Sequence, residues 1–157
     1  MMTLRLSVLA LATLLAVPGY AQDKPASNMD ILRQKLQADK KLVVAANMDL
    51  KEAEAKGFWP VYDAYQADLG MLNERLVKLI RRYADHYKTN TLTDEAAKSL
   101  LDEAIAIEQA EVTLKQVYVP KLSYVLPATK VARYLQIENK IRAVIKYELA
   151  DAIPLVP

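Results

Sequence analysis

The 157-residue sequence has no cysteine and only one histidine. Without cysteine the chain cannot form a disulfide, so helix packing and polar contacts have to hold the fold together. An ordinary zinc or copper site takes several cysteine or histidine ligands. His86 alone cannot make such a site within one chain unless carboxylates supply the other ligands. We therefore expect no metal site and no other cofactor.

Glycine is also scarce, with three residues in the whole chain. The sequence has neither a glycine-rich phosphate loop nor a Gly-x-Ser-x-Gly nucleophile motif. Glu108, Glu111 and Glu138 could meet in a helical bundle, but a two-metal centre there also needs Glu-x-x-His pairs, which are missing. Glu138 is expected instead to pair with Arg133, Arg142 or another basic residue. The sequence thus predicts a protein that is not an enzyme.

The charges are close to balance, with 21 Lys and Arg residues against 19 Asp and Glu residues. A nucleic-acid-binding protein usually carries a large basic excess or an uncompensated basic patch. The balance therefore gives no support for a nucleic-acid partner. After the first 21 residues no stretch is apolar enough to cross a membrane, so we expect no transmembrane segment in the mature chain.

The first 21 residues have the layout of a secretory signal peptide. Arg5 precedes an almost wholly apolar run from Leu6 to Val17, and residues 18–21 break the helix and end in a small residue. This run of 12 residues is shorter than the roughly 20 that span a bilayer, which argues against a membrane anchor. We expect cleavage after Ala21 and a mature chain, residues 22–157, that forms a single secreted domain.

The stretch 49–119 organises the rest of the chain. Apolar residues recur there at spacings of three and four, the heptad pattern of a helix packed lengthwise against another. The first series is Tyr62, Tyr65, Leu69, Leu72, Leu76, Leu79 and Tyr83, and the second, looser one is Leu100, Ala104, Ile107, Leu114 and Tyr118. With a turn near residues 88–93, they predict a long antiparallel helical hairpin. No segment has a β-strand period, so we expect an all-α fold without a β-sheet.

Two further helices are expected at the ends of the domain, over residues 29–46 and 128–150. The first would bury Met29, Leu32, Leu36, Val43 and Ala46 on one face. Asp49 is the expected N-cap of the next helix, with Glu52 completing a capping box, and Thr93 is the expected N-cap of the helix after the turn.

Prolines interrupt both helices of the predicted hairpin. A proline inside a helix removes one backbone hydrogen bond and clashes with the preceding turn. At Pro60 we favour a kinked, continuous helix over a restart, because the apolar series continues through Trp59 and Tyr62. The following helix is expected to reach about Val119, where Pro120 bends or ends it. The apolar end, residues 153–157, is expected to lie back across the bundle.

Charges differ in sign between the two predicted hairpin helices. The basic residues are Arg75, Lys78, Arg81, Arg82, His86 and Lys88, and the acidic ones are Asp94, Glu95, Asp102, Glu103, Glu108 and Glu111. An antiparallel hairpin would set these stretches side by side, where exposed pairs add only about 0–1 kcal/mol each. A solvated face explains many of these charges equally well.

Tyrosine is common, with nine residues against one phenylalanine and one tryptophan. The favoured interpretation is an aromatic core stripe whose hydroxyl groups reach the rim. The alternative is a partly exposed amphipathic face, since tyrosine combines apolar contact with tolerance of water and suits adaptable binding.

The start of the second hairpin helix carries a family resemblance. Leu92-Thr93-Asp94-Glu95 resembles the beginning of the LTxxQ motif of the Spy/CpxP-type periplasmic helical proteins, although Ala96 stands where the motif has glutamine. The segment that opens with Met48-Asp49-Leu50-Lys51 is similar, with Lys51 in place of threonine. Residues 133–139 also resemble the last helix of that family.

The resemblance implies a periplasmic chaperone that handles unfolded envelope proteins without ATP and works as a homodimer with a basic, amphipathic face. On this chain the candidate face consists of Arg75, Lys78, Arg81, Arg82, Tyr83 and Tyr87. The alternative is a dedicated regulator or structural partner of one envelope protein, such as a stress-sensor kinase.

Overall fold

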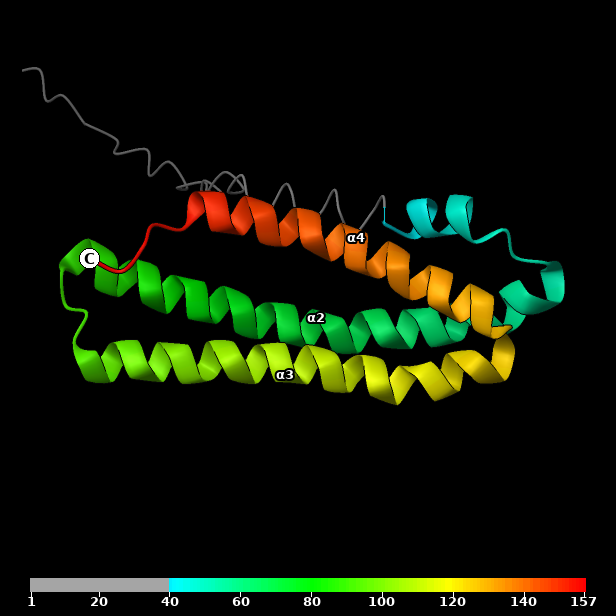
Figure 1. Cartoon of the computed structure of the whole chain (residues 1–157), viewed down its shortest axis with the longest axis horizontal. Coiled ribbons are helices and arrows are strands. Elements are labelled where there is room, and N and C mark those ends of the chain that lie inside the picture. Colours follow the sequence, from blue (N-terminus) through cyan, green and yellow to red (C-terminus); the bar gives the residue numbers. More distant parts are fainter. Residues whose placement is uncertain (1–39) are drawn as a thin grey trace, which may run out of the picture. The chain divides into compact units, whose positions relative to one another are not determined.

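The computed structural model describes residues 40–157 (Figure 1). Its helices are α2 (Glu52–Thr89), α3 (Asp94–Val125) and α4 (Ala128–Ala152), preceded by helical residues 40–48. Because residues 40–157 contain helices and no strand, the predicted all-α fold is confirmed. Among these helices none is both long and apolar enough to span a bilayer. The expected signal peptide and the first part of the expected 29–46 helix lie outside the described residues.

α2 and α3 lie side by side and run in opposite directions (Figure 1). Gly57 near the start of α2 approaches Val125 at the end of α3. Farther along α2, the Arg82 side chain reaches Ser99 near the start of α3, with a 3.3 Å hydrogen bond. The backbone of α4 stays farther from α2, so large side chains bridge the space between them.

The N-cap of α2 is Lys51, so the prediction of Asp49 was wrong. The Lys51 backbone N–H donates to the Glu54 carboxylate at 2.8 Å. Asp49 instead has a left-handed backbone, with φ of 46°, and ends the preceding helical residues. The Lys130 ammonium holds the junction, donating to the Asp49 carbonyl at 2.6 Å and to Glu54. The hydrogen bond from Lys130 lowers the pKa of Glu54.

The turn between α2 and α3 has the expected capping residues. Thr93 is the N-cap of α3, and its hydroxyl oxygen accepts from the Ala96 N–H at 3.2 Å, which confirms the prediction. Asn90 ends α2 in the left-handed conformation, with φ of 52°. The Thr91 N–H then donates back to the His86 carbonyl at 3.0 Å. His86 lies in the last turn of α2, where the helix dipole favours a basic group.

Neither internal proline ends its helix. α2 continues through Pro60, and α3 continues through Pro120 to Val125, six residues beyond the expected end at Val119. Both prolines are exposed, so water can reach the carbonyl groups that lose their helical donors. After α4 the chain turns back to α2, where the Tyr83 hydroxyl donates to the Pro154 carbonyl at 2.9 Å.

Two apolar clusters form the core. The larger contains Val44, Met48, Phe58, Tyr62, Tyr65, Tyr118, Leu122, Leu126, Val131 and Tyr134. The smaller contains Leu79, Leu100 and Ile107, with partly buried Leu76, Tyr83, Leu92 and Ala104 against it. The larger cluster thus collects side chains from every helix, whereas the smaller one is built by α2, α3 and their connection.

Helical residues 40–48 bury a different face from the predicted one. Val44 and Met48 are fully buried, whereas Val43 is 43% exposed and Ala46 is exposed as well. Lys40, Val44 and Met48 follow one another at intervals of four residues and therefore line one side of the helix. We attribute the difference to this arrangement, which also brings Lys40 to a buried carboxylate of α4.

The two glycines of α2 are expected to respond oppositely to substitution by alanine. A Cβ atom on Gly57 would lie 2.9 and 3.0 Å from Val125 Cγ1 and Cβ, whereas one on Gly70 would meet nothing within 4 Å. Valine is stiff, so Gly57→Ala should lower the free energy of unfolding by about 1–2 kcal/mol. Gly70→Ala should raise it by about 0.5–1 kcal/mol through helix propensity. Urea denaturation of both variants checks this, and equal effects would contradict the described α2–α3 contact.

Candidate functional site

The structure places the predicted basic residues of α2 in different directions. The Arg75 guanidinium binds both carboxylate oxygens of Glu103 on α3, at 3.1 and 3.2 Å. Arg82 reaches Ser99 of α3 as well. Both arginines therefore contribute to the α2–α3 contact, Arg75 through an ion pair and Arg82 through a hydrogen bond to a neutral hydroxyl group.

The two tyrosines of the candidate face, Tyr83 and Tyr87, lie near each other. The ring centroids of Tyr83 and Tyr87 are 5.9 Å apart, and Tyr83 bonds to the chain after α4. Lys78 and Arg81 are exposed. Because successive helical residues are rotated by roughly 100°, Arg81 points roughly 160° away from Tyr83. The structure thus brings the tyrosines together without joining all six residues into one face.

Two acidic residues of α3 contact α4 rather than the basic end of α2. Glu111 pairs with the Arg142 guanidinium, and Glu108 lies 3.6 Å from the Lys146 ammonium. Glu103, by contrast, meets Arg75 of α2 as the charge pattern suggested. The acidic face of α3 is therefore divided between its two neighbours.

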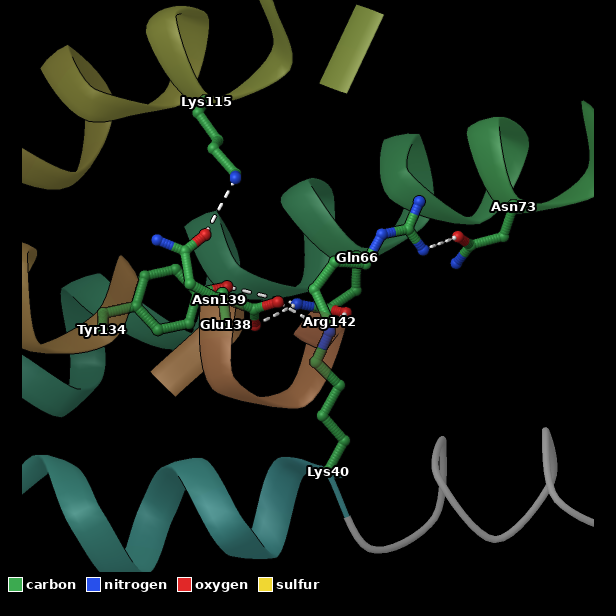
Figure 2. Close-up of polar contacts among 8 residues, drawn as sticks. All are labelled: Lys40, Gln66, Asn73, Lys115, Tyr134, Glu138, Asn139 and Arg142. Atoms are coloured by element: carbon green, nitrogen blue, oxygen red, sulfur yellow. Dashed lines mark hydrogen bonds and ion pairs between the residues drawn. The ribbon is translucent and has the colours of Figure 1, made fainter. Parts of the chain in front are cut away.

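A layer of polar side chains lies beside the larger apolar cluster, and Figure 2 shows its members other than Glu111. We call it the polar layer; it consists of Lys40, Gln66, Asn73, Glu111, Lys115, Tyr134, Glu138, Asn139 and Arg142. Glu138, 4% exposed, pairs with the Lys40 ammonium at 2.7 Å and accepts from Gln66 at 2.9 Å. The expected ion pair of Glu138 is therefore present. Its basic partner is Lys40 rather than Arg133 or Arg142.

Arg142 joins α4 to both other long helices in this layer. Its guanidinium pairs with Glu111 of α3 and donates to the Asn73 side-chain oxygen of α2 at 2.8 Å. Its Nε is buried and has no partner among the described residues. Burial lowers the pKa of Arg142. The Lys115 ammonium donates to Asn139 at 2.8 Å, which is a further link between α3 and α4.

The polar layer borders a cavity of about 40 Å³. Ligand pockets usually measure about 300–1,000 Å³, so this cavity is much smaller than a typical substrate site. Its size suits ordered water, and Glu111, Glu138 and Arg142 lie in its otherwise largely apolar lining. Such water commonly satisfies buried polar groups. The cavity is therefore no candidate for a small-molecule site, and a binding surface has to be sought on the outer faces of the helices.

The larger cluster is rich in aromatic rings that meet edge to face. The Tyr134 ring lies 5.1 Å from that of Phe58 and 6.0 Å from that of Tyr65, with interplanar angles of 83° and 76°. Burial raises the pKa of Tyr62 and of Tyr118 to about 12, so both stay neutral. For these tyrosines the predicted core role is confirmed.

Helical residues 40–48, which we call the strap, cover part of this aromatic cluster. The strap buries Val44 and Met48, while the Lys41 ammonium pairs with Asp63 at 2.8 Å and lies 5.1 Å from the Trp59 ring. Val44 and Met48 are its only fully buried side chains, and the Lys41–Asp63 pair is exposed to solvent. Because few buried contacts hold it, the strap is among the most weakly held of the described helical segments.

A row of exposed apolar side chains lies on α3. Leu101, Ile105 and Val112 are 59%, 46% and 55% exposed. Their spacings of four and seven residues place them on one side of the helix, over a length of about 16 Å. Single exposed apolar residues are ordinary, but an aligned group marks a candidate contact surface. We call these three residues the α3 row.

Sequence reasoning missed the α3 row because it assigned one apolar series of α3 to the core. That series, with Leu100 and Ile107, is indeed buried. The second series starts one residue later, at Leu101, and its periodicity could have been found in the sequence. Two tyrosines, Tyr124 and Tyr147, are also strongly exposed, at 92% and 76%.

The described part of the chain thus belongs to the all-α class and presents apolar contact surface on its helices. No known family model matches the sequence, and comparisons with curated proteins and with solved structures gave no significant match.

Proposed function

We propose that the protein is a non-enzymatic binding protein of the periplasm that holds unfolded envelope proteins without ATP. The observation that carries this proposal is the α3 row. Unfolded proteins expose apolar side chains, and an aligned apolar row offers them contact along one helix. Glu108, three residues after Ile105 and four before Val112, lies on the same side of α3 within the row. It keeps the surface hydrated together with the nearby Lys98–Asp102 ion pair.

Two other features support the proposal. Tyr124 and Tyr147 add exposed aromatic surface, which makes adaptable contacts at low entropic cost. The sequence start resembles a signal peptide, and the Leu92–Glu95 segment resembles a motif of periplasmic helical proteins. We also propose a homodimer, because two copies of the α3 row would bind one client with higher avidity than a single row.

The second candidate is a dedicated regulator or structural partner of one envelope protein, such as a stress-sensor kinase. The length of the α3 row favours it, because a groove in one partner could accept a helix face of this size. A pull-down from envelope extract distinguishes the candidates, since a single tight partner supports the regulator and many weak ones support the chaperone.

Light scattering of a chemically unfolded, aggregating client tests the proposed function. The mature chain should suppress scattering near stoichiometric ratio without nucleotide. Replacing Leu101, Ile105 and Val112 by serine should reduce suppression at least threefold, because the apolar contact surface is lost while the core is untouched.

The matched control replaces three exposed apolar residues outside the row, Val117, Val144 and Leu155, by serine. This control should keep wild-type suppression. Absence of suppression by the wild-type chain would reject the chaperone proposal, and equal losses in both triple variants would remove the α3 row as the site.

A further inference from the structure

We infer that the surface beneath the strap is a second client-binding site, for which residues 40–48 act as a built-in competitor. The inference rests on the proposed function, because it specifies which client segments such a protein would bind. Its basis is the match between the strap and the surface that it covers.

The covered surface is apolar in its middle and acidic at two places. Phe58, Tyr62 and Tyr134 belong to the cluster in which Val44 and Met48 are fully buried. At the acidic places, the carboxylates of Glu138 and Asp63 receive the strap lysines, Lys40 and Lys41. A segment that replaces the strap therefore needs apolar side chains together with a basic group.

The strap itself defines the spacing of such a segment. Lys40, Val44 and Met48 stand four residues apart, so one helix side presents a basic group followed by two apolar groups. An amphipathic segment with this pattern can form the same apolar contacts and the same ion pair with Glu138. The partner class is therefore a helix-forming stretch of an unfolded protein with a lysine or arginine one turn before two large apolar residues.

The structure allows the strap to leave without disrupting α2. The strap ends at Met48, and the following residue, Asp49, has a left-handed backbone that separates the strap from α2. α2 begins with its own cap, in which the Lys51 N–H and the Lys130 ammonium bind Glu54. Apart from Lys40, Val44 and Met48, the strap residues are exposed. Local opening of weakly held segments of this kind is common in folded proteins.

A strap locked in place tests the inference. The natural chain has no cysteine, so Lys41→Cys and Asp63→Cys can be joined selectively by a short bifunctional maleimide. The control is the same double variant capped on each cysteine by N-ethylmaleimide. The probe is a fluorescein-labelled peptide with the sequence of residues 37–50. The locked protein should bind it at least tenfold more weakly than the capped control.

A released strap gives the opposite expectation. Val44→Asp with Met48→Asp removes both buried anchors, and peptide affinity should then rise at least tenfold over the wild type. A peptide carrying the same two substitutions should not bind. Trp59, the only tryptophan, reports the departure of the strap by a red-shifted emission.

The results separate the inference from the proposed function. Equal peptide affinity in the locked and capped proteins would overturn the inference, as would a folded released variant that does not bind the peptide. If the released variant fails to fold, the comparison of peptide affinity between the locked and capped proteins still tests the inference. If wild-type chain suppresses client aggregation and locking leaves that suppression unchanged, the proposed function stands while the strap site is rejected. Weaker suppression after locking supports the inference.

Discussion

Replacing Tyr134 by alanine should lower the free energy of unfolding by about 3–5 kcal/mol, the range for deleting a buried aromatic ring. Tyr134 is fully buried and contacts the rings of Phe58, Tyr62 and Tyr65. It fills the space between α4 and α2, so its removal leaves a cavity that the bridged helices cannot readily close. Urea denaturation followed by circular dichroism measures the loss.

Two controls separate the packing of the ring from the hydroxyl and from surface effects. Tyr134→Phe removes the hydroxyl group, which accepts from Gln66 at 3.2 Å and also interacts with Glu138, and should cost about 1 kcal/mol. Tyr124→Ala removes a tyrosine that is 92% exposed and should change stability by less than about 0.5 kcal/mol. Similar losses for the Tyr134→Ala and Tyr124→Ala variants would contradict the placement of Tyr134 in the core.

Replacing Arg142 by methionine should lower the free energy of unfolding by about 3 kcal/mol, because it leaves the buried carboxylate of Glu111 without its partner. Glu111 is 8% exposed, and the next ammonium, that of Lys146, is 3.9 Å away. Methionine retains most of the apolar stem, so the loss reports on the charge rather than on packing. Denaturation at neutral pH is the measurement.

The double variant Arg142→Met with Glu111→Leu should recover most of this loss, because replacing both members of a buried ion pair by apolar residues is often neutral. Lys98→Met provides a surface comparison. Its pair with Asp102 is exposed, so the loss should stay below about 1 kcal/mol. If the double variant were as unstable as the single one, the unpaired carboxylate would not be the cause.

The fold class was predictable because it depends on local patterns. The apolar spacing of three and four runs through α2 and α3, and Thr93 caps its helix within three residues of sequence. Continuation through Pro60 also followed from the uninterrupted apolar series. The end of α3 was less predictable, since nothing local tells whether Pro120 stops a helix whose next turns are held by Leu122 and Leu126 in the core.

The buried face of the strap and the N-cap of α2 were predicted wrongly because both depend on tertiary packing. Val43 and Ala46 fit a helical stripe as well as Val44 and Met48 do, so periodicity alone cannot choose between them. The choice depends on Lys40 reaching Glu138, a residue nearly a hundred positions later. Asp49 has the chemistry of an N-cap but takes the left-handed conformation because the chain must change direction there.

The candidate binding surfaces also depend partly on local sequence and partly on tertiary packing. Sequence could supply the exposed basic residues and tyrosines of α2, yet only the structure shows that Arg75 is engaged by Glu103. The partners in the polar layer come from different helices, and one sequence without its fold does not reveal which carboxylate meets which cation. The α3 row was visible as a period, but its exposure depends on where α2 and α4 pack.

The polar layer also selects one register of α4 against α2 and α3. Apolar stripes that repeat every turn can slide past one another by about 5.4 Å and still bury similar surface. Such a slip of α4 would separate Arg142 from Glu111 and Glu138 from Gln66. Each buried group left without a partner costs about 1–3 kcal/mol. The layer therefore discriminates against shifted packings that the apolar clusters alone would tolerate.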